Sequence, residues 1–362
     1  MKIFFIRYKK TKNILEGGEL GSQKNYNVLV SLVGEQNIDT YYVYDESRKT
    51  MLTEYVKGVW FFLQNYYFRL TPRRVREIVQ MAANYDVVFI DRSVFGIIAK
   101  RLKQSGYAGR IICFFHNIEA MYFAAKIPRW APWRWLVCRC ADRNDAYCCR
   151  YGDKVIALNQ RDNQELRQRY HRAADVLIPV AFKDKYQKEC YPSAMTGNPL
   201  QCLFLGAYFK PNCDGIEWFI RNVLPHVPAH LTIVGKGMAQ LRKSDFMTSD
   251  IDIVSDAPDL VPYFEQADAM ILPIFAGGGM KVKTCESLMY GKNIIATDES
   301  LMGYDVDAQK MGGRCNTAEE YIAVINDFVA HPRPRFNAYC RQLYLEKYSE
   351  SAVTDRFRMV LQ

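Results

Sequence analysis

The chain has 362 residues, of which 49% are hydrophobic and 24% charged, and these proportions exclude a disordered or fibrous protein. Because a single hydrophobic core rarely keeps growing beyond ~250–300 residues, a chain of this length predicts two domains. No apolar run approaches the ~20 residues that span a bilayer, and the start MKIFFIRYKK lacks a signal-peptide pattern, so we expect a cytoplasmic protein.

The net charge of +9 is concentrated in the first half. Residues 1–180 hold 29 Lys and Arg against 17 Asp and Glu, whereas residues 181–362 hold 19 against 22. A basic half favours an anionic partner, and charge alone admits lipid headgroups, phosphorylated acceptors and nucleic acid. The basic residues form no known nucleic-acid-reading motif, so we expect no nucleic acid as a partner. The 11 cysteines are odd in number and irregularly spaced, which favours free thiols.

Residues 1–180 alternate short apolar runs with helix-like stretches, a pattern that predicts a mostly parallel sheet. Helices are expected around residues 27–34 and over 93–106. The expected strands are MKIFFI, YDVVFID, RIICFFH, KVIALN and ADVLIPV. We therefore expect an N-terminal α/β domain over residues 1–180.

A polar stretch after Val180, FKDKYQKECYPSAMTGNP, predicts an interdomain linker, and the alternation then restarts. Helices are expected over 214–224 and from about 279 to 290. The expected strands are LQCLFLG, HLTIVG, IDIVS, DAMILP and NIIAT. This pattern predicts a second doubly wound α/β domain over 181–345, and the apolar spacing near the end predicts a C-terminal helix, 346–362, that packs back on the first domain.

The segment MILPIFAGGGMKVKTCESLMYGKNIIA carries the strongest signal of a binding site. It runs from a buried strand through three glycines into a helix on which Gly279, Lys283 and Glu286 share one face. Glycines at a helix start let an anion approach backbone N–H groups, and Lys283 adds a positive charge. Glu286 can accept hydrogen bonds from a vicinal diol such as a ribose. The face therefore predicts a nucleotide site; the alternative is a surface turn with a solvated Lys–Glu pair.

Together with FLGAYFKPNCDGIEWFIRNVLP and LTIVG before it, this segment resembles the donor domain of bacterial glycosyltransferases of family 4. The resemblance covers nearly the whole chain and is specific in the second half. It implies the GT-B fold, an α/β architecture of two doubly wound parallel-sheet Rossmann-like domains facing across a cleft. It also implies a retaining, metal-independent hexosyltransferase that needs no cofactor besides its co-substrate, a nucleotide-diphosphate sugar.

The resemblance further implies that the sugar goes to a hydroxyl of a glycan or lipid-linked acceptor in cell-surface polysaccharide synthesis. Two departures from the family stand in the donor domain. Glu286 matches the second glutamate of the family's pair, but Gly278 replaces the first, so backbone N–H groups would hold the sugar there. Ala207 follows Gly206 where many members have an arginine. The cations left for the diphosphate are Lys210, Lys281 and Lys283.

In the first domain, His116 begins HNIEAMYF, which resembles the loop that places a histidine against the transferred sugar. Gly17 and Gly18 resemble the loop that approaches the diphosphate; the alternatives are a structural histidine and a flexible turn. The predicted catalytic residues are His116, Lys283 and Glu286. The predicted donor-binding residues are Gly17, Gly18, Gly206, Lys210, Gly235, Lys236, Val254, Leu260, Gly277, Gly278, Gly279, Met280, Lys281, Lys283 and Glu286, with the base near 254–260.

Two clusters in the basic half place aromatic rings beside cations, which suits a membrane interface or an acceptor site. The alternative is an aromatic core with a solvated basic edge. The residues of the two clusters are Trp60, Arg73, Arg74, Trp130, Trp133, Arg134 and Trp135. We therefore expect peripheral contact with anionic membrane, at the inner face of the plasma membrane.

Two other functions remain open on the sequence alone. A nucleotide-sugar epimerase can share this fold, and a non-catalytic scaffold could bind the same donor. Asp-x-Asp strings at 250–252 and 305–307 are attributed to chance, because the lysine-rich helix start already supplies the charge a metal ion would. We therefore expect no metal site.

Overall fold

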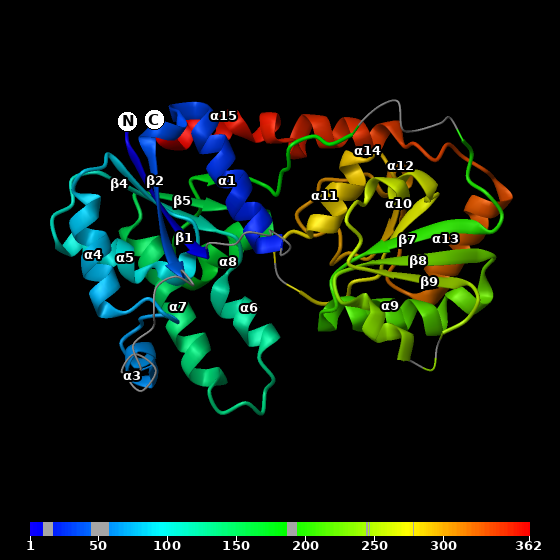
Figure 1. The fold of residues 1–362 in the computed structure, drawn as a ribbon, viewed down its shortest axis with the longest axis horizontal. Coiled ribbons are helices and arrows are strands. Elements are labelled where there is room, and N and C mark those ends of the chain that lie inside the picture. Colours follow the sequence, from blue (N-terminus) through cyan, green and yellow to red (C-terminus); the bar gives the residue numbers. More distant parts are fainter. Residues whose placement is uncertain (10–16, 45–57, 187–193, 244, 246, 278) are drawn as a thin grey trace. The chain divides into compact units, whose positions relative to one another are not determined.

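The computed structural model describes residues 1–9, 17–44, 58–186, 194–243, 245, 247–277 and 279–362 (Figure 1). The chain forms two compact units, which we call unit 1 (Met1–Val180 with Val353–Gln362) and unit 2 (Ala181–Ala352). Each unit contains a six-stranded sheet in which every neighbouring pair of strands is parallel.

The sheet of unit 1 has the order β2-β1-β3-β4-β5-β6. Its strands are β1 (Ile3–Lys9), β2 (Ile38–Tyr44), β3 (Val87–Ile90), β4 (Arg110–Phe115), β5 (Lys154–Ala157) and β6 (Val176–Leu177). Its helices are α1 (Gly17–Val33), α3 (Gly58–Leu63), α4 (Pro72–Ala82), α5 (Ile97–Gln104), α6 (Glu119–Lys126), α7 (Arg134–Tyr151), α8 (Gln160–Tyr170) and α15 (Glu350–Leu361), with short 3₁₀ turns at Glu35–Asn37 and Ser93–Phe95.

Strands β3 and β4 are continuous apolar runs because both faces of this sheet are covered. On one face, Val88 and Ile90 pack with residues of α4, α5 and α7. On the other, Phe89 and Phe114 stack against Phe357 of α15 at centroid distances of 6.3 and 6.4 Å. The C-terminal helix is thus part of the core of unit 1.

The sheet of unit 2 has the order β12-β11-β10-β7-β8-β9. Its strands are β7 (Leu200–Leu205), β8 (Ala229–Gly235), β9 (Ile251–Ser255), β10 (Ala269–Leu272), β11 (Asn293–Ala296) and β12 (Gly312–Arg314). Its helices are α9 (Lys210–Asn222), α10 (Val261–Gln266), α11 (Val282–Met289), α12 (Ala308–Met311), α13 (Ala318–Ala330) and α14 (Ala338–Leu343), with 3₁₀ turns at Leu224–His226 and Met238–Lys243 and a π-helical turn at Tyr344–Tyr348.

Both sheets contain a topological switch point, the place where the strand order reverses. In unit 1 the chain passes from β1 to β2 on one side and then to β3 on the other. In unit 2 it passes from β7 through β8 to β9 and then to β10 on the opposite side of β7. Ligands of open parallel sheets bind beyond the carboxyl ends of the strands at such points. We therefore expect ligands at the loops that follow β1 and β3 in unit 1 and β7 and β10 in unit 2.

The expected α/β class and doubly wound parallel sheets are confirmed. Two expected helix starts are wrong. Helix α11 begins at Val282 rather than near residue 279, because Gly279 has φ 62°, outside the helical region. Helix α9 begins earlier than expected, at Lys210, with a proline in its first turn. Strands β2 and β12 have no counterpart among the predicted elements.

In the part of the chain that the structure describes, no helix is long and apolar enough to cross a membrane. The ten cysteines in that part are all free thiols, and eight of the ten are buried in the cores. They behave as small apolar residues.

Candidate functional site

The loops after β7 and β8 approach each other closely at the carboxyl edge of the sheet of unit 2. A Cβ atom on Gly235 would lie 1.8 Å from the carbonyl oxygen of Gly206, so no other residue fits at this position without backbone movement. The Gly206 N–H in turn donates to Val234 O at 3.0 Å. The two predicted donor-binding glycines thus lie together, and they leave backbone exposed beside the switch point.

The loop between β10 and α11 contains the glycine-rich segment. Gly279 has φ 62°, a conformation that glycine adopts without strain, and Met280 is buried behind it. Gly278 lies outside the described residues. Gly277 approaches Lys281, whose Nζ donates to the Gly279 carbonyl at 3.1 Å. The prediction that Gly279, Lys283 and Glu286 share one face of a helix is therefore wrong for Gly279, because this residue precedes α11.

Lys283, in the first turn of α11, links this loop to the other side of the switch point. Its ammonium donates to Asn212 Oδ1 at 2.6 Å and lies 4.4 Å from the centre of the Phe204 ring of β7. Burial, together with the charge of Lys281, lowers the pKa of Lys283 to about 7, although Glu286 acts in the opposite direction. At neutral pH this lysine is poised to take up a proton when an anion arrives.

Glu286 lies one turn further along α11 and is partly buried. Burial raises the pKa of Glu286 to about 7, against the charges of Lys185 and Lys283, which lower it. Among the described residues no side chain or backbone group donates a hydrogen bond to its carboxyl group. A partly buried carboxyl group without such donors is available for the hydroxyl groups of a ligand.

The other predicted cations have different surroundings. Lys281 Nζ lies 2.7 Å from Glu299 Oε1, so its charge is balanced and it braces the glycine-rich loop. The Lys210 side chain is 83% exposed and pairs with Asp214 one turn later on α9 at 2.8 Å. Lys236 is exposed after β8. Of the three cations expected to hold the diphosphate, Lys210 and Lys281 are in ion pairs, whereas Lys283 contacts Asn212 after β7 and is in no ion pair among the described residues.

Asn212 is a site residue that sequence reasoning missed. Its side-chain nitrogen donates to Ala207 O at 2.8 Å while its oxygen accepts from Lys283. It therefore ties the loop after β7 to α11, and it positions the lysine. Its signal in the sequence, an asparagine two residues into a helix that follows a buried strand, also occurs in ordinary helix starts.

The segment expected to lie near a nucleobase follows β8 and β9. Val254 is in β9, the edge strand, and Leu260 is the residue before α10. Asp256, with φ 59°, donates its backbone N–H to Gly235 O at 3.3 Å and its carboxylate accepts from Ser255 Oγ at 2.6 Å. These contacts join the loop after β9 to Gly235, on the same edge of the sheet as Lys283.

In unit 1 the switch point lies between the loops after β1 and β3. Gly17 and Gly18 begin α1, and a Cβ on Gly18 would lie 2.7 Å from the Arg92 guanidinium. Arg92 pairs with the buried Glu19 at 3.0 Å. The predicted glycine pair thus adjoins an arginine whose charge is already balanced, and Arg92 is a second residue that sequence reasoning missed.

His116, at the end of β4, is 9% exposed and faces Asp91 at the end of β3. Its Nε2 lies 3.3 Å from Asp91 Oδ1, and Asn25 donates to the same carboxylate at 2.7 Å, as Ser22 does. Burial acts to raise the pKa of Asp91, but the charge of His116 and these hydrogen bonds hold the pKa below its ordinary value. Asp91 was not predicted, although it directly follows the buried run VVFI.

Two further buried acids lie behind His116. Burial raises the pKa of Glu119, against the charge of Arg92, and raises that of Asp145 well above its ordinary value. Asp145 accepts from Ala120 N–H at 3.1 Å, in the first turn of α6. The two groups therefore hold protons to higher pH than exposed carboxylates do.

The predicted membrane or acceptor residues divide into exposed and buried members. Trp60, Trp130, Trp133 and Trp135 are exposed, as is Arg73, and Arg134 is partly exposed. Arg74 does not belong to this surface. It is only 9% exposed, because its guanidinium donates to Val43 O at 2.7 Å and to Arg69 O at 2.9 Å inside unit 1.

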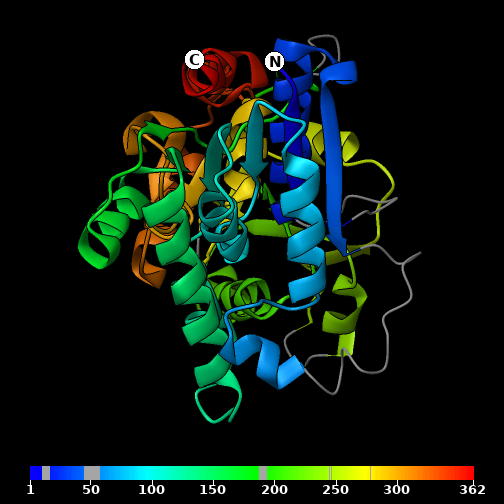
Figure 2. The same ribbon diagram turned by 90° about the vertical axis from the view of Figure 1, so that its left-hand side faces the viewer.

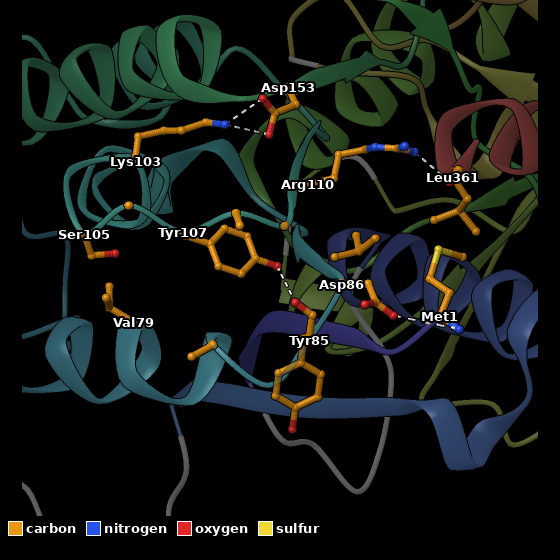
Figure 3. Close-up of a pocket in the computed structure, with 15 residues that line it drawn as sticks. Met1, Val79, Tyr85, Asp86, Lys103, Ser105, Tyr107, Arg110, Asp153 and Leu361 are labelled. Carbon is orange, nitrogen blue, oxygen red and sulfur yellow. Dashed lines mark hydrogen bonds and ion pairs between the residues drawn. The ribbon is translucent and has the colours of Figure 1, made fainter.

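A cavity of about 1020 Å³ lies elsewhere in unit 1, between the turn after α5 and the amino ends of β3 and β4 (Figure 3). Its charges are paired among themselves: Lys103 contacts Asp153 at 2.7 Å, and the terminal amino group lies 3.9 Å from Asp86. It lies at the edge of the sheet opposite to His116 and Asp91. We therefore do not assign it a ligand, since ligands of such sheets bind at the carboxyl edge.

No three His, Cys, Asp or Glu side chains within the described ranges gather where they could hold a metal ion.

Residues 199–328 match the family model described as glycosyl transferases group 1. None of the curated proteins compared with this sequence matches it. Solved structures of similar fold include HepE of Anabaena in complex with UDP, with 13% identity and a TM-score of 0.67, covering 100% of this chain and 99% of that one.

Two further structures are similar over the same extent. Sucrose-phosphate synthase of Thermosynechococcus elongatus has 12% identity and a TM-score of 0.72, covering 100% of this chain and 98% of that one. The lipopolysaccharide outer core galactosyltransferase WaaB in its apo form has 15% identity and a TM-score of 0.69, covering 100% and 99%. At such identities the likeness shows the fold, which is GT-B.

Proposed function

Unit 2 contains a domain of the glycosyl transferases group 1, and from that premise we propose that the protein transfers a sugar from a nucleotide-diphosphate sugar, with retention of configuration. The acceptor is a hydroxyl group of a glycan or lipid-linked molecule in cell-surface polysaccharide synthesis. The protein works in the cytoplasm. One neighbour of the same fold, HepE of Anabaena, was solved with UDP and with UDP-glucose, which supports a nucleotide sugar as the donor.

The observation that carries the proposal is the position of Lys283. It spans the β7/β10 switch point through Asn212, and its lowered pKa leaves it about half protonated at neutral pH. A diphosphate would lie against the Lys283 ammonium and the first N–H groups of α11. Its negative charge would raise the pKa of Lys283, so that the lysine becomes fully protonated when the diphosphate binds. Glu286, with no donor among the described residues, would accept the ribose hydroxyl groups.

In this proposal Lys283 and the start of α11 stabilise the charge that develops on the departing diphosphate. The acceptor proton goes to a diphosphate oxygen, since no described side chain at the switch point of unit 2 is placed as a base. His116 of unit 1 contacts the transferred sugar or positions the acceptor. No metal ion is required, because Lys283 and the helix start supply the positive charge. Chelator should therefore leave the rate unchanged.

The test is a screen of nucleotide sugars by thermal shift, followed by an assay of nucleoside diphosphate release with and without a membrane extract as the source of acceptor. We expect one donor to stabilise the protein and to be consumed only when the acceptor is present, with the anomeric configuration retained in the product. Conversion of the donor without acceptor would instead indicate an epimerase. Binding without any turnover would indicate a scaffold.

A further inference from the structure

We propose that one end of unit 1 is a docking surface for an anionic lipid bilayer. We call it the aromatic tip and define it as α3 with the segment up to Phe68, together with the turn between α6 and α7. Figures 1 and 2 show α3 and this turn at the same end of unit 1, and Arg139 of α7 donates to Leu63 O at 3.3 Å, which ties the two parts together. This inference does not rest on the proposed transferase activity.

Exposed apolar side chains are concentrated at the aromatic tip. Six of the 16 large hydrophobic residues that are exposed in the described chain belong to it, and a seventh, Trp135 in the first turn of α7, directly follows it. The seven are Val59, Trp60, Leu63, Phe68, Trp130, Trp133 and Trp135. Four of the five tryptophans of the protein are among them, with exposures from 55% to 79%. Because tryptophan is highly buried on average, four exposed indoles at one end indicate a surface that binds something apolar.

The turn between α6 and α7 is ordered by contacts that leave its indoles outside. The guanidinium of Arg134 donates to Ala124 O at 2.9 Å and to Ile127 O at 3.2 Å, which closes the turn, and Ala131 is buried beneath it. Trp130, Trp133 and Trp135 are therefore held outward on a fixed support. Little conformational entropy remains to be lost when they bind.

The aromatic residues of the first segment divide by environment. Tyr66 is buried, and Tyr67 packs with Phe62 and Phe123 at ring distances of 5.7 and 5.5 Å. These inner rings join the segment after α3 to α6. Trp60 and Phe68 remain exposed, at 60% and 44%. The expected alternative, an aromatic core, thus accounts for the inner rings but not for the outer ones.

The charge of the aromatic tip favours an anionic partner. Residues 58–68 are uncharged, and residues 120–139 contain four Lys and Arg and no Asp or Glu. Lys126 and Arg129 flank the exposed indoles directly and are themselves exposed. Tryptophan beside lysine and arginine is the composition of a membrane interface, where the indole lies among the headgroups. Each basic residue near an anionic surface strengthens binding by about fivefold.

The occupant we infer is a lipid surface rather than a soluble glycan. A glycan site needs polar side chains directed at hydroxyl groups around its aromatic rings, whereas the exposed side chains of the α6–α7 turn are indoles and cations. The turn between α6 and α7 also projects at the end of unit 1, as Figures 1 and 2 show, and its indoles are exposed, which suits insertion into headgroups.

The experiment uses the full chain with Trp218 replaced by Phe, so that the four remaining indoles report only from the aromatic tip. With vesicles of phosphatidylglycerol we expect a blue shift of the emission and sedimentation of the protein with the lipid. Both effects should weaken as salt is added, because screening reduces attraction to the headgroups. With vesicles of phosphatidylcholine we expect at least about fivefold weaker binding.

The decisive variant is W130A/W133A/W135A in the otherwise wild-type chain, with L345A/M359A as a control that removes exposed apolar side chains outside the tip. We expect the triple variant to lose about tenfold or more of its partition into phosphatidylglycerol vesicles, and the control to retain it. R129E tests the charge separately, through the salt dependence. Far-UV circular dichroism and the midpoint of thermal unfolding check that each variant is folded.

Three results would overturn the proposal. Equal binding of the triple variant and the control would show that the tip is not the contact. Absence of any vesicle binding by the wild-type chain would show that no lipid surface is bound. If the triple variant bound vesicles as the wild-type chain does but no longer transferred sugar to a soluble glycan, the tip would recognise the acceptor and not the lipid surface.

Discussion

The switch points of the two units have the same sheet topology but opposite electrostatic states. In unit 1 the carboxylate of Asp91 is fully buried and satisfied, with donors from two residues of α1 and His116 3.3 Å away. In unit 2, the ammonium group of Lys283 has one hydrogen-bond partner among the described residues, Asn212, and the carboxyl group of Glu286 has none there. The first arrangement stabilises a fixed negative charge inside the protein. The second leaves a lysine and a glutamate whose side chains can bind the charged and hydroxyl groups of a ligand.

The pKa directions express the same difference. The pKa of Asp91 lies below its ordinary value because its partners favour the charged form. The pKa of Lys283 and that of Glu286 both move to about 7, toward the neutral form. Groups that remain poised near neutral pH in a crevice are typical of binding and catalytic sites. The comparison therefore supports the proposal that the donor binds unit 2, and it favours a structural role for Asp91.

The largest expected effect that tests this comparison is that of Lys283→Met. Transfer should fall by about 10² or more, because the cation that stabilises the departing diphosphate is lost. Steady-state rates at saturating donor measure this. Lys310→Met, at an exposed lysine of α12 in the same unit, is the matched control and should retain the wild-type rate. A Lys283→Met enzyme with wild-type turnover would refute the assignment.

The same substitution should stabilise unit 2. The folded pKa of Lys283 lies below that of the unfolded chain, so the unfolded chain binds more protons between pH 7 and 10.5 and stability rises with pH in that window. Removing the buried ammonium should raise the free energy of unfolding at neutral pH by about 2 kcal/mol. Chemical denaturation of the wild-type protein and of Lys283→Met tests this. A less stable Lys283→Met protein would contradict the view that the buried lysine lowers the stability of unit 2 for the sake of binding.

Asp91→Ala should destabilise unit 1, in contrast to the stabilisation of unit 2 expected for Lys283→Met. Removing a buried carboxylate leaves Ser22, Asn25 and His116 without their common partner and should cost about 3 kcal/mol. Hydrogen exchange should show protection lost in β1 and β3 and kept in β7 and β10. If instead donor binding by unit 2 failed while β3 kept its protection, Asp91 would have a functional role that the comparison denies it.

Asn212→Ala should reduce donor affinity by about tenfold, because the hydrogen bond that positions Lys283 is removed. The substitution keeps the lysine, so it separates positioning from charge. Asn222→Ala is a suitable control, since Asn222 lies on the same helix and its side-chain nitrogen donates to Trp218 O at 2.7 Å, away from Lys283. Equal affinities of the two variants would show that the Asn212–Lys283 contact is incidental.

A smaller effect is expected from pH. A bound diphosphate raises the pKa of Lys283, so binding takes up a proton at any pH between about 7 and the raised value. The dissociation constant of the donor should therefore increase up to about tenfold for each pH unit above 7. The measurement is a binding titration at several pH values, and a constant affinity from pH 7 to 9 would exclude a titrating lysine at the site.

Much of this fold could be predicted from the sequence, for reasons visible in particular elements. Strands such as β3 and β4 are covered on both faces, so their sequences are unbroken apolar runs. Strand β2, IDTYYVY, lies at the edge of its sheet with Asp39 exposed, and β12 is only Gly312–Arg314. Neither contains the run of β-branched residues that marks a buried strand, so neither was predicted.

The site could be predicted only where its residues lie in one segment. Lys283 and Glu286 were found because they follow three glycines on one short helix. The partners that define their chemistry come from elsewhere: Asn212 is 71 positions away from Lys283, and Glu299 is 18 positions from Lys281. The first contact depends on β10 lying beside β7 and the second on β10 lying beside β11, and no local pattern in the sequence indicates these neighbours.

The central claim is that Lys283 takes up a proton as it binds the donor diphosphate. Its most direct test is calorimetric titration of the nucleoside diphosphate at about pH 8, where the ordinary pKa of a free diphosphate and that of Glu286 are both exceeded. Repeating the titration in buffers of different ionisation enthalpy gives the number of protons bound. The account predicts close to one proton taken up by the wild-type protein and none by Lys283→Met. Equal uptake by both proteins, or no uptake by the wild type, would contradict it.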